Sequence, residues 1–339
     1  MAKTALVTGI RGQDGTYLGK FLLEKGYRVW GADRRSGDAT HWRAKRLGIE
    51  SDIHHMYMDL LEYSNVLRTL DRVQPDEIYN LAAQSFVSAS FEQPIVTTTI
   101  NAIGVLHLLE SIRTVNPKIR FYQASTSEMF GKAQQTPQSE TTPFHPRSPY
   151  GVSKVFGHWI TVNYRESYGT FACCGILFNH ESPLRGEEFV TRKISLAASR
   201  ISRGKQDKVV LGNLDAKRDW GYAAEFVEGM WLMLQQNQAD DYVLATGESH
   251  SIREFADLAF SKVGIPLQWH GDAMEARGID SSGVVRVEVS PDYYRPAEVD
   301  ALKGDATKAR ERLGWKPRTT FQNLVELMVE SDLQYDSVV

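Results

Sequence analysis

A tyrosine and a lysine four residues apart are the side chains of this sequence best suited to proton and hydride chemistry. Tyr150 and Lys154 lie in the run YGVSK, directly after Pro149. On a helix, this spacing places both side chains on one face, within reach of the same ligand. The lysine can lower the pKa of the phenol, which can then take a hydroxyl proton while hydride leaves the same carbon. A tyrosine and a lysine at this spacing often have only a structural role, so neighbouring motifs are needed to indicate a catalytic one.

Polar residues at the end of an apolar run supply a second reactive group. The run IRFYQAS, residues 119–125, is followed by Thr126, Ser127 and Glu128. A strand end that faces a ligand crevice is where reactive side chains belong. Ser or Thr there can hydrogen-bond the hydroxyl group that Tyr150 deprotonates, and Glu128 can act as acid and base on an adjacent carbon. The competing interpretation is a helix cap with an acidic first turn.

Three glycines near the N-terminus predict a phosphate-binding turn. Gly9, Gly12 and Gly15 lie in TGIRGQDG, between the first predicted strand and the first predicted helix. Only glycine lets the backbone turn tightly there and approach a pyrophosphate at the helix N-terminus. A bare three-glycine match could be a plain turn, but its place at the start of a βαβ series predicts dinucleotide binding.

The end of the second predicted strand bears on which dinucleotide is bound. Asp33 would hold the ribose 2′-hydroxyl of NAD, whereas Arg34 and Arg35 would accommodate the 2′-phosphate of NADP. Two guanidinium groups aimed at a phosphate can outweigh one carboxylate, so we expect NADP. Asp59 and Leu60, at the next strand end, are placed to meet the adenine, and the run LAAQS at 81–85 is placed to border the nicotinamide ribose.

Short apolar runs alternate with amphipathic stretches through the first half of the chain. The pattern predicts strands at 4–9, 27–33, 54–60, 76–82, 119–125 and 170–178, and helices at 15–25, 66–72, 103–115 and 153–167. Repeated β-α-β units with nearly continuous apolar strands are typical of a parallel sheet covered on both faces. The predicted fold is therefore α/β, a doubly wound parallel sheet of the Rossmann type, with its ligand crevice at the carboxyl ends of the strands.

The pattern changes after Phe178, where charged loops and helices at 192–203, 252–263 and 321–333 are expected. We therefore predict a dinucleotide-binding domain made of residues 1–182 and 213–248. A smaller, discontinuous substrate domain would comprise residues 183–212 and 249–335.

The composition excludes several classes of protein. With 39 Lys+Arg against 42 Asp+Glu among 339 residues, the net charge is −3, which argues against a nucleic-acid partner. No uninterrupted apolar stretch of about 18 residues exists, so no membrane span is expected. Adjacent Cys173 and Cys174 are typical of buried apolar residues, and no metal site is expected. MAKTALVTG does not resemble a signal peptide, so we expect a cytoplasmic protein.

Taken together, these motifs resemble a known family. TGIRGQDG, STSE and YGVSK resemble the extended short-chain dehydrogenase/reductases. Within that group, RGQDGTYL, DRRS, NLAAQSFVSAS, QASTSEMFG, PFHPRSPYGVSK, FNHESPLRGEEFVTRKI and YYRPAEVD resemble the GDP-mannose 4,6-dehydratase family, over roughly residues 4–327. Related dTDP-glucose dehydratases usually show Thr-Asp-Glu at positions 126–128, and 4-epimerases usually lack the glutamate. One departure is Asp33, because an uncharged or basic residue would sit more easily beside NADP.

The resemblance implies a role for each matching residue. The active-site residues would be Thr126, Glu128, Tyr150 and Lys154. Besides Tyr150 and Lys154, the predicted cofactor contacts are Gly9, Arg11, Gly12, Gln13, Asp14, Gly15, Arg34, Arg35, Asp59, Leu60, Leu81, Ala82, Ala83, Gln84, Ser85, His180 and Arg185. The predicted substrate contacts are Ser85, Thr126, Ser127, Glu128, Asn179, Phe189, Val190, Lys193, Arg218, Arg295 and Glu298. Arg218 and Arg295 would hold the diphosphate and Glu298 the ribose, although Arg218 could also form a local ion pair with Asp219.

The implied activity is the conversion of GDP-mannose to GDP-4-keto-6-deoxymannose with loss of water. The resemblance also implies a homotetramer, in which the loop 34–38 could reach a neighbouring cofactor site. Three alternatives remain: a dehydratase for another nucleotide sugar, a 4-epimerase or 4-reductase on the same scaffold, and a non-catalytic NADP-sensing regulator. Glu128 disfavours the epimerase and reductase, and the intact set Tyr150, Lys154 and Glu128 disfavours the regulator.

Overall fold

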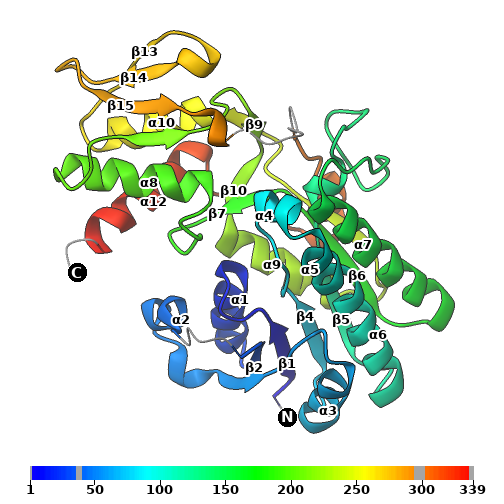
Figure 1. Cartoon of the computed structure of the whole chain (residues 1–339). Coiled ribbons are helices and arrows are strands. Elements are labelled where there is room, and N and C mark those ends of the chain that lie inside the picture. The colour runs from blue at the N-terminus through cyan, green and yellow to red at the C-terminus, as the bar shows by residue number, and fades with distance from the viewer. Residues whose placement is uncertain (1, 36–39, 294–301, 336–339) are drawn as a thin grey trace.

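A seven-stranded parallel sheet forms the centre of the larger part of the molecule (Figure 1). The computed structural model describes residues 2–35, 40–293 and 302–335. The strands lie in the order β11-β6-β5-β4-β1-β2-β3. Their bounds are β1 Thr4–Thr8, β2 Arg28–Asp33, β3 His54–Tyr57, β4 Glu77–Asn80, β5 Arg120–Thr126, β6 Ala172–Leu177 and β11 Asp241–Leu244. The predicted doubly wound α/β fold is thereby confirmed.

Helices cover both faces of this sheet. Successive residues of a strand point to opposite faces, so Ala5 and Val7 of β1 join one buried cluster and Leu6 joins the other. The first cluster includes side chains from α1 (Gln13–Glu24), α2 (Trp42–Leu47), α9 (Ala223–Leu234) and α11 (Thr307–Leu313). The second includes side chains from α3 (Tyr63–Val73), α6 (Gly104–Val115) and α7 (Pro149–Tyr168). Buried apolar side chains on both faces explain why the strands are almost uninterruptedly apolar.

A smaller unit with its own core lies beyond the carboxyl ends of the strands (Figure 1). It combines three helices with a four-stranded sheet of order β13-β14-β15-β8. Its elements are α8 Val190–Ser202, α10 Ile252–Lys262, α12 Phe321–Tyr335, β8 Val209–Leu211, β13 Gln268–His270, β14 Arg277–Ile279 and β15 Val285–Val289. Two small sheets, β7 (Asn179–Glu181) with β10 (Trp220–Tyr222) and β9 (Lys217–Arg218) with β12 (His250–Ser251), occupy the region between the two units.

The two cores do not follow the predicted domain boundaries everywhere. Leu214 and Trp220, predicted in the dinucleotide-binding domain, pack in the core of the smaller unit. Ala309, Leu313 and Trp315, predicted in the substrate domain, pack in the core beside the large sheet. The chain therefore crosses between the units more often than the change in sequence pattern indicates. The proposed division into domains stays a prediction.

The helix that carries Tyr150 begins earlier than its apolar spacing predicts. The expected helix at 153–167 extends over Pro149–Tyr168 because Ser148 caps it. The Ser148 hydroxyl accepts a hydrogen bond from the amide of Gly151 at 3.0 Å, and a proline is well suited to the first helical position. The expected strand at 54–60 ends at Tyr57. Sequence periodicity missed the short helices α2, α4 (Val87–Glu92) and α5 (Pro94–Thr98), and the seventh strand β11.

One helical run among the described residues is long and apolar enough to cross a membrane. It spans Pro94–Val115 and includes α5, a π-helical turn (Thr99–Ile103) and α6. Half of its apolar window is buried inside the protein, where Val105, Leu108 and Ile112 pack in the core. Core helices of soluble proteins often have this length and apolar composition, so the run is weak evidence of membrane insertion.

Candidate active site

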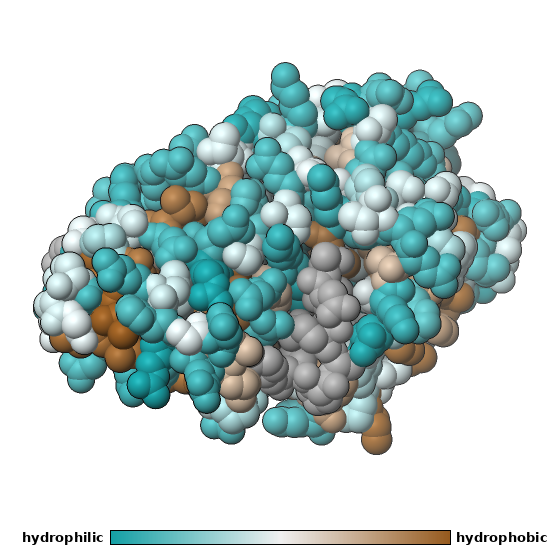
Figure 2. Space-filling view, turned by 90° about the horizontal axis from the view of Figure 1, so that it is seen from above, coloured by the Kyte–Doolittle hydropathy of each residue, from teal (hydrophilic) through white to brown (hydrophobic). Residues whose placement is uncertain are grey.

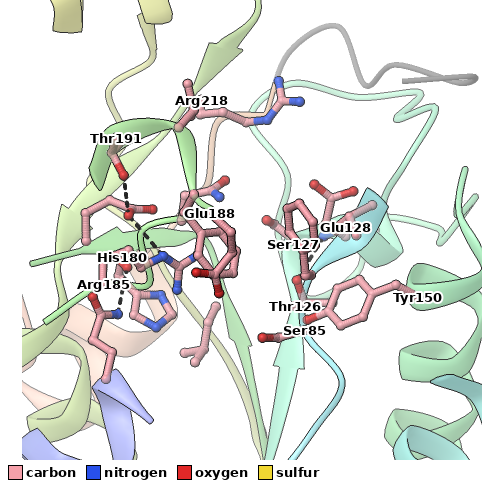
Figure 3. A pocket seen from close by; sticks show the side chains of 18 of the residues that line it. Ser85, Thr126, Ser127, Glu128, Tyr150, His180, Arg185, Glu188, Thr191 and Arg218 are labelled. Carbon is pink, nitrogen blue, oxygen red and sulfur yellow. Dashed lines mark hydrogen bonds and ion pairs between the residues drawn. The ribbon is translucent and has the colours of Figure 1, made fainter. Parts of the chain in front are cut away.

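A cleft of about 380 Å³ opens at the carboxyl ends of β1, β4, β5 and β6, between the large sheet and the smaller unit (Figure 3). Twenty of the predicted site residues line it: Gly9, Gly12, Gln13, Asp14, Gly15, Leu81, Ala83, Ser85, Thr126, Ser127, Glu128, Tyr150, Lys154, Asn179, His180, Arg185, Phe189, Val190, Lys193 and Arg218. Arg295 and Glu298 lie outside the described residues. Residues predicted from distant motifs are therefore brought together around one cavity.

The glycine turn has the shape that a pyrophosphate requires. A Cβ atom added to Gly15 would lie 2.3 Å from the carbonyl oxygen of Gly9, and one added to Gly9 would lie 2.9 Å from the amide nitrogen of Ala82. Because these neighbours are backbone atoms, no side-chain movement would relieve the clash. Gly9 also has a φ of 69°, which is unfavourable for other residues. The turn leaves a cradle at the N-terminus of α1 that fits the phosphates of a dinucleotide.

Asp33 is already paired with a cation of the same turn. Its carboxylate lies 3.1 Å from Nε of Arg11, whose guanidinium also donates a hydrogen bond to the carbonyl oxygen of Arg34. Burial raises the pKa of Asp33, and the nearby Arg11 charge opposes that rise. Arg11 thus balances part of the charge of the Asp33 carboxylate.

Several predicted cofactor residues do not line the cleft: Arg11, Arg34, Arg35, Asp59, Leu60, Ala82 and Gln84. Leu60 differs most from expectation, because its side chain is buried among the helices α3 and α6 and only 6% exposed. The side chain of Leu60 therefore supports the core, and adenine contact at this position would have to come from the backbone. The backbone amide of Gln84 donates a hydrogen bond to the side-chain oxygen of Asn101 at 2.9 Å.

Thr126, Glu128 and Tyr150 converge on one wall of the cleft (Figure 3). Thr126 ends β5, and its hydroxyl accepts a hydrogen bond from the amide of Glu128 at 3.2 Å. The alternative interpretation as a helix cap is therefore correct for Thr126, yet Glu128 still lines the cavity. A Cβ atom added to Gly151 would lie 2.9 Å from the carbonyl oxygen of Glu128. Glycine at this position lets the start of α7 pass directly against the Glu128 turn.

Burial dominates the electrostatics of the Tyr150–Lys154 pair in the protein alone. It raises the pKa of Tyr150 to about 12, even though a contact with the Thr126 hydroxyl lowers it. Burial also lowers the pKa of Lys154 to about 8. The Lys154 ammonium donates to the carbonyl oxygen of Ala124 at 2.9 Å and lies 5.8 Å from the centre of the Tyr150 ring. In the protein by itself, burial therefore outweighs the influences that lower the pKa of the Tyr150 phenol.

An ion pair that the sequence did not predict joins the start of α1 to β7. His180 Nε2 lies 2.7 Å from a carboxylate oxygen of Asp14, and Nδ1 lies 2.7 Å from the carbonyl oxygen of Phe178. Burial would raise the pKa of Asp14, but the charge and hydrogen bond of His180 lower it to about 2. For His180, burial favours the neutral ring, but Asp14 raises the pKa. The pair braces the floor of the cleft beside the glycine turn.

This pair predicts how the stability of the cofactor-free protein varies with pH. The pKa of His180 is higher in the folded than in the unfolded protein, so its stabilisation is present below about pH 6.5 and is lost as pH rises through the folded value. Asp14 contributes above about pH 4, and its stabilisation is lost as pH falls towards 2. We expect the urea midpoint to fall between pH 6 and 9, and to fall less in Asp14→Asn. Equal slopes for Asp14→Asn, the surface control Asp71→Asn and the wild type would contradict this role.

The opposite wall of the cleft carries cations and aromatic rings. Arg185 pairs with Glu181 at 3.1 Å, and its guanidinium lies 3.6 Å from the centre of the Phe189 ring. The Lys193 ammonium lies 3.6 Å from the centre of the Tyr293 ring. Aromatic rings beside fixed cations can hold a nucleotide through stacking and charge. Tyr293 was missed from the sequence because nothing in its local pattern places it opposite Lys193.

Arg218 also lines this wall, at the edge between β9 and β10. The neighbouring Asp219 is fully buried and accepts hydrogen bonds from the backbone amides of Thr246, Gly247 and Gly304 and from the Thr246 hydroxyl. These four hydrogen bonds anchor Asp219 to residues 246, 247 and 304, which is a different role from the local ion pair with Arg218 considered from the sequence. The anchored strand positions Arg218 at the cleft.

The seven-stranded sheet, the glycine cradle and the Tyr-x-x-x-Lys pair at the cleft agree with the resemblance to the extended short-chain dehydrogenase/reductases. Residues 6–328 match the family model described as GDP-mannose 4,6 dehydratase. A GDP-mannose 4,6-dehydratase of Sinorhizobium fredii is 52% identical over 98% of this chain and 97% of its own length. The chain therefore belongs to the GDP-mannose 4,6-dehydratase family.

Solved structures share the fold at lower sequence identity. A dTDP-glucose 4,6-dehydratase of Bacillus anthracis in complex with NAD has a TM-score of 0.81 and 19% identity, over 99% of this chain and 98% of its own. The protein RMD of Pseudomonas aeruginosa, complexed with NADPH, has a TM-score of 0.75 and 20% identity, over 98% of this chain and 100% of its own. At this identity, the likeness concerns the fold alone.

Proposed function

We propose that the protein removes water from GDP-mannose to form GDP-4-keto-6-deoxymannose, as a nucleotide-sugar hydro-lyase. The observation that carries the proposal is the place of Glu128, which lines the same wall of the cleft as Tyr150 and Thr126. Simple hydride transfer at one carbon needs no such carboxylate, whereas elimination across two neighbouring carbons needs an acid and base. Family membership over nearly the whole chain supports the same reaction.

The residues divide the chemistry among three neighbouring carbons of the hexose, C4, C5 and C6. A bound nicotinamide dinucleotide supplies the hydride acceptor for C4 and later the hydride donor for C6. Tyr150, hydrogen-bonded to Thr126, takes the proton of the 4-hydroxyl. The 4-ketone acidifies the proton on C5, which Glu128 removes. Glu128 then gives a proton to the departing 6-hydroxyl, so that water leaves, and C5 is protonated again at the end.

The deciding experiment is mass spectrometry of GDP-mannose incubated with the purified protein and a trace of NADP⁺. The loss of one water, with no net reduction of the cofactor, is the expected result. An unchanged mass with a rearranged sugar would indicate an epimerase. A gain of two hydrogens by a 4-keto nucleotide sugar, in a separate incubation with NADPH, would indicate a reductase. Competition by GDP, UDP and dTDP distinguishes the nucleotide. Cofactor binding without turnover of any nucleotide sugar would support the regulator.

We also propose that NADP is preferred over NAD. Arg34 and Arg35 follow β2 directly, and the pairing of Asp33 with Arg11 reduces the repulsion that a 2′-phosphate would meet. Replacing either Arg34 or Arg35 by alanine is expected to raise the Kd of NADP about tenfold, which is the usual loss for a hydrogen bond to a charged group. Calorimetric titration with NADP and NAD measures this. Arg68→Ala, on the exposed side of α3, is the control. Equal weakening for both dinucleotides would contradict the assignment.

We propose that the protein is a homotetramer and that α5 and α7 form one of its interfaces. Ile95, Val152, Phe156 and Trp159 are 80%, 55%, 42% and 56% exposed, and α5 and α7 lie side by side (Figure 1). The face in Figure 2 is mainly hydrophilic, with apolar residues in small groups. An apolar patch of this kind marks an interaction surface. The other part of the predicted assembly, loop 34–38, lies mostly outside the described residues.

The double variant Phe156→Glu/Trp159→Glu is expected to yield smaller species in light scattering, because a charged face cannot be buried against a second copy. The double variant Glu24→Gln/Glu187→Gln, which changes exposed residues on other elements, serves as the control. A wild-type protein that is a fully active monomer would reject the tetramer.

A further inference from the structure

Glu188 lines the cleft, yet the chemistry described above gives it no part. It lies in the turn between β7 and α8 and is exposed. Within the described part of the chain, no salt bridge joins its carboxylate to a cation, whereas the nearby Glu181 pairs with Arg185 and Glu187 lies near Arg200. An acidic group in this position is available to a ligand.

The turn itself holds the carboxylate in place. The amide of Phe189 donates a hydrogen bond to the carbonyl oxygen of Gly186 at 3.1 Å. The Glu188 side chain folds back over Gly186, so that a Cβ atom added there would lie 2.4 Å from each carboxylate oxygen. Gly186 therefore leaves the space that the carboxylate occupies, and the position of the carboxylate depends on that glycine.

The charges around Glu188 keep it compatible with a site that must also accept phosphates. The positive charge of Arg43 attracts Glu188, while the Arg43 guanidinium donates its hydrogen bonds to the carbonyl oxygens of Leu184 and Arg11. The carboxylate thus has a nearby cation that does not occupy its oxygens. Its hydrogen-bonding capacity remains for a donor in the cleft.

The layout of the cleft limits which donor this can be. A diphosphate has no donors and would be repelled by a carboxylate, whereas sugar hydroxyls are suitable donors. In Figure 3, Glu188 lies across the cavity from Thr126 and Ser127, and Arg218 lies further out towards the mouth. If Thr126, Glu128 and Tyr150 serve C4, C5 and C6 and the diphosphate is attached to C1, the hydroxyls that remain for the opposite wall are those at C2 and C3.

We propose that Glu188 accepts a hydrogen bond from the hexose hydroxyl at C2 or C3 and is a specificity-determining residue for the sugar. The inference rests on the proposed function, because it uses the hexose orientation that function requires. The bond forms with the substrate in its ground state and involves no reacting atom. Loss of Glu188 should therefore weaken substrate binding and leave the chemical step nearly unchanged.

The test pairs enzyme variants with substrate analogues. For Glu188→Gln, we expect KM for GDP-mannose to rise about 5- to 10-fold with little change in kcat, because a hydrogen bond to a charged acceptor is replaced by one to a neutral amide. For GDP-2-deoxymannose or GDP-3-deoxymannose, whichever lacks the partner hydroxyl, wild type and variant should differ by less than about twofold, since the two changes act on the same bond. The analogue that gives this result identifies the hydroxyl.

Two further variants separate this role from a structural one. Glu187→Gln changes the adjacent carboxylate, which does not line the cleft, and should leave KM unchanged. Gly186→Ala should displace the Glu188 carboxylate and raise KM for GDP-mannose while Glu188 itself is retained. The affinity for GDP alone should be unchanged in Glu188→Gln.

The inference is overturned if Glu188→Gln has the KM of the wild type, or if the substitution weakens the binding of both deoxy analogues as strongly as that of GDP-mannose. It is also overturned if the substitution weakens the binding of GDP equally, since the carboxylate would then serve the nucleotide. These outcomes all presuppose that the wild-type protein dehydrates GDP-mannose. Failure of the wild type to do so rejects the proposed function, and is seen before any variant is compared.

Discussion

Glu128→Gln is expected to oxidise C4 of the sugar but to stall before water leaves. The amide has nearly the shape of the carboxylate, so the turn capped by Thr126 should persist, but it cannot take the C5 proton. Dehydration should fall by about a hundredfold to ten-thousandfold, the usual range for a lost general acid or base. Reduced cofactor should accumulate in the complex with GDP-mannose, visible as nicotinamide absorbance that the wild type shows only transiently.

Hydrogen exchange provides a second measurement for the same variant. In heavy water, the wild type should place deuterium on C5 of the product, whereas Glu128→Gln should leave the C5 hydrogen of the bound 4-keto sugar unexchanged. Glu187→Gln, on the opposite side of the cleft entrance and outside its lining, should behave as the wild type. Normal dehydration by Glu128→Gln would reject this residue as the acid and base of the elimination.

Tyr150→Phe is expected to block the reaction one step earlier. The ring fills the same buried space, so folding should be little affected, and only the hydroxyl next to Thr126 is removed. Without that hydroxyl the group assigned to take the 4-hydroxyl proton is gone, and turnover should fall by about a hundredfold to ten-thousandfold. Unlike Glu128→Gln, this variant should accumulate no reduced cofactor when GDP-mannose is added.

The pH profile distinguishes the role of Tyr150 from simple packing. Burial raises the pKa of Tyr150 to about 12 in the protein alone, and the positive charge of a bound nicotinamide ring would lower it. The wild-type rate of C4 oxidation should therefore rise with pH up to the pKa that Tyr150 has in the complex. Tyr150→Phe should lack this rise, and Tyr168→Phe, on an exposed turn of the same helix, should retain it. Near-normal turnover of Tyr150→Phe would reject the assignment.

Local patterns were enough to predict the fold and most of the cleft. The glycine turn, the strand end at Thr126 and the pair Tyr150–Lys154 each depend on a few consecutive residues, and a doubly wound sheet necessarily gathers strand ends at one edge. Contacts between distant segments were not visible. Asp14 and His180 are 166 positions apart, and no periodicity indicates that they pair. Leu60 follows a strand end, but its side chain points into the core because Gly104 leaves room for it.

The missed residues share a physical cause. Glu188 lies in a turn and Tyr293 ends a short 3-10 helix (Pro291–Tyr293), where neither the α-helical nor the strand period fixes the direction of a side chain. The position of α11 beside the large sheet, where Ala309 and Leu313 are buried, is likewise not indicated by its short apolar pattern.

The close passage of α7 against the Glu128 turn at Gly151 holds the two reactive groups next to each other. Tyr150 and Glu128 both come from the sheet-centred part of the molecule, whereas Arg185, Glu188, Phe189 and Lys193 come from the segment that leads into α8 and from the first turn of α8. The reaction and the choice of sugar nucleotide are thus encoded in separable parts of the chain. A redesign of 183–193 can change the accepted substrate while the spacing between the base for C4 and the base for C5 is preserved.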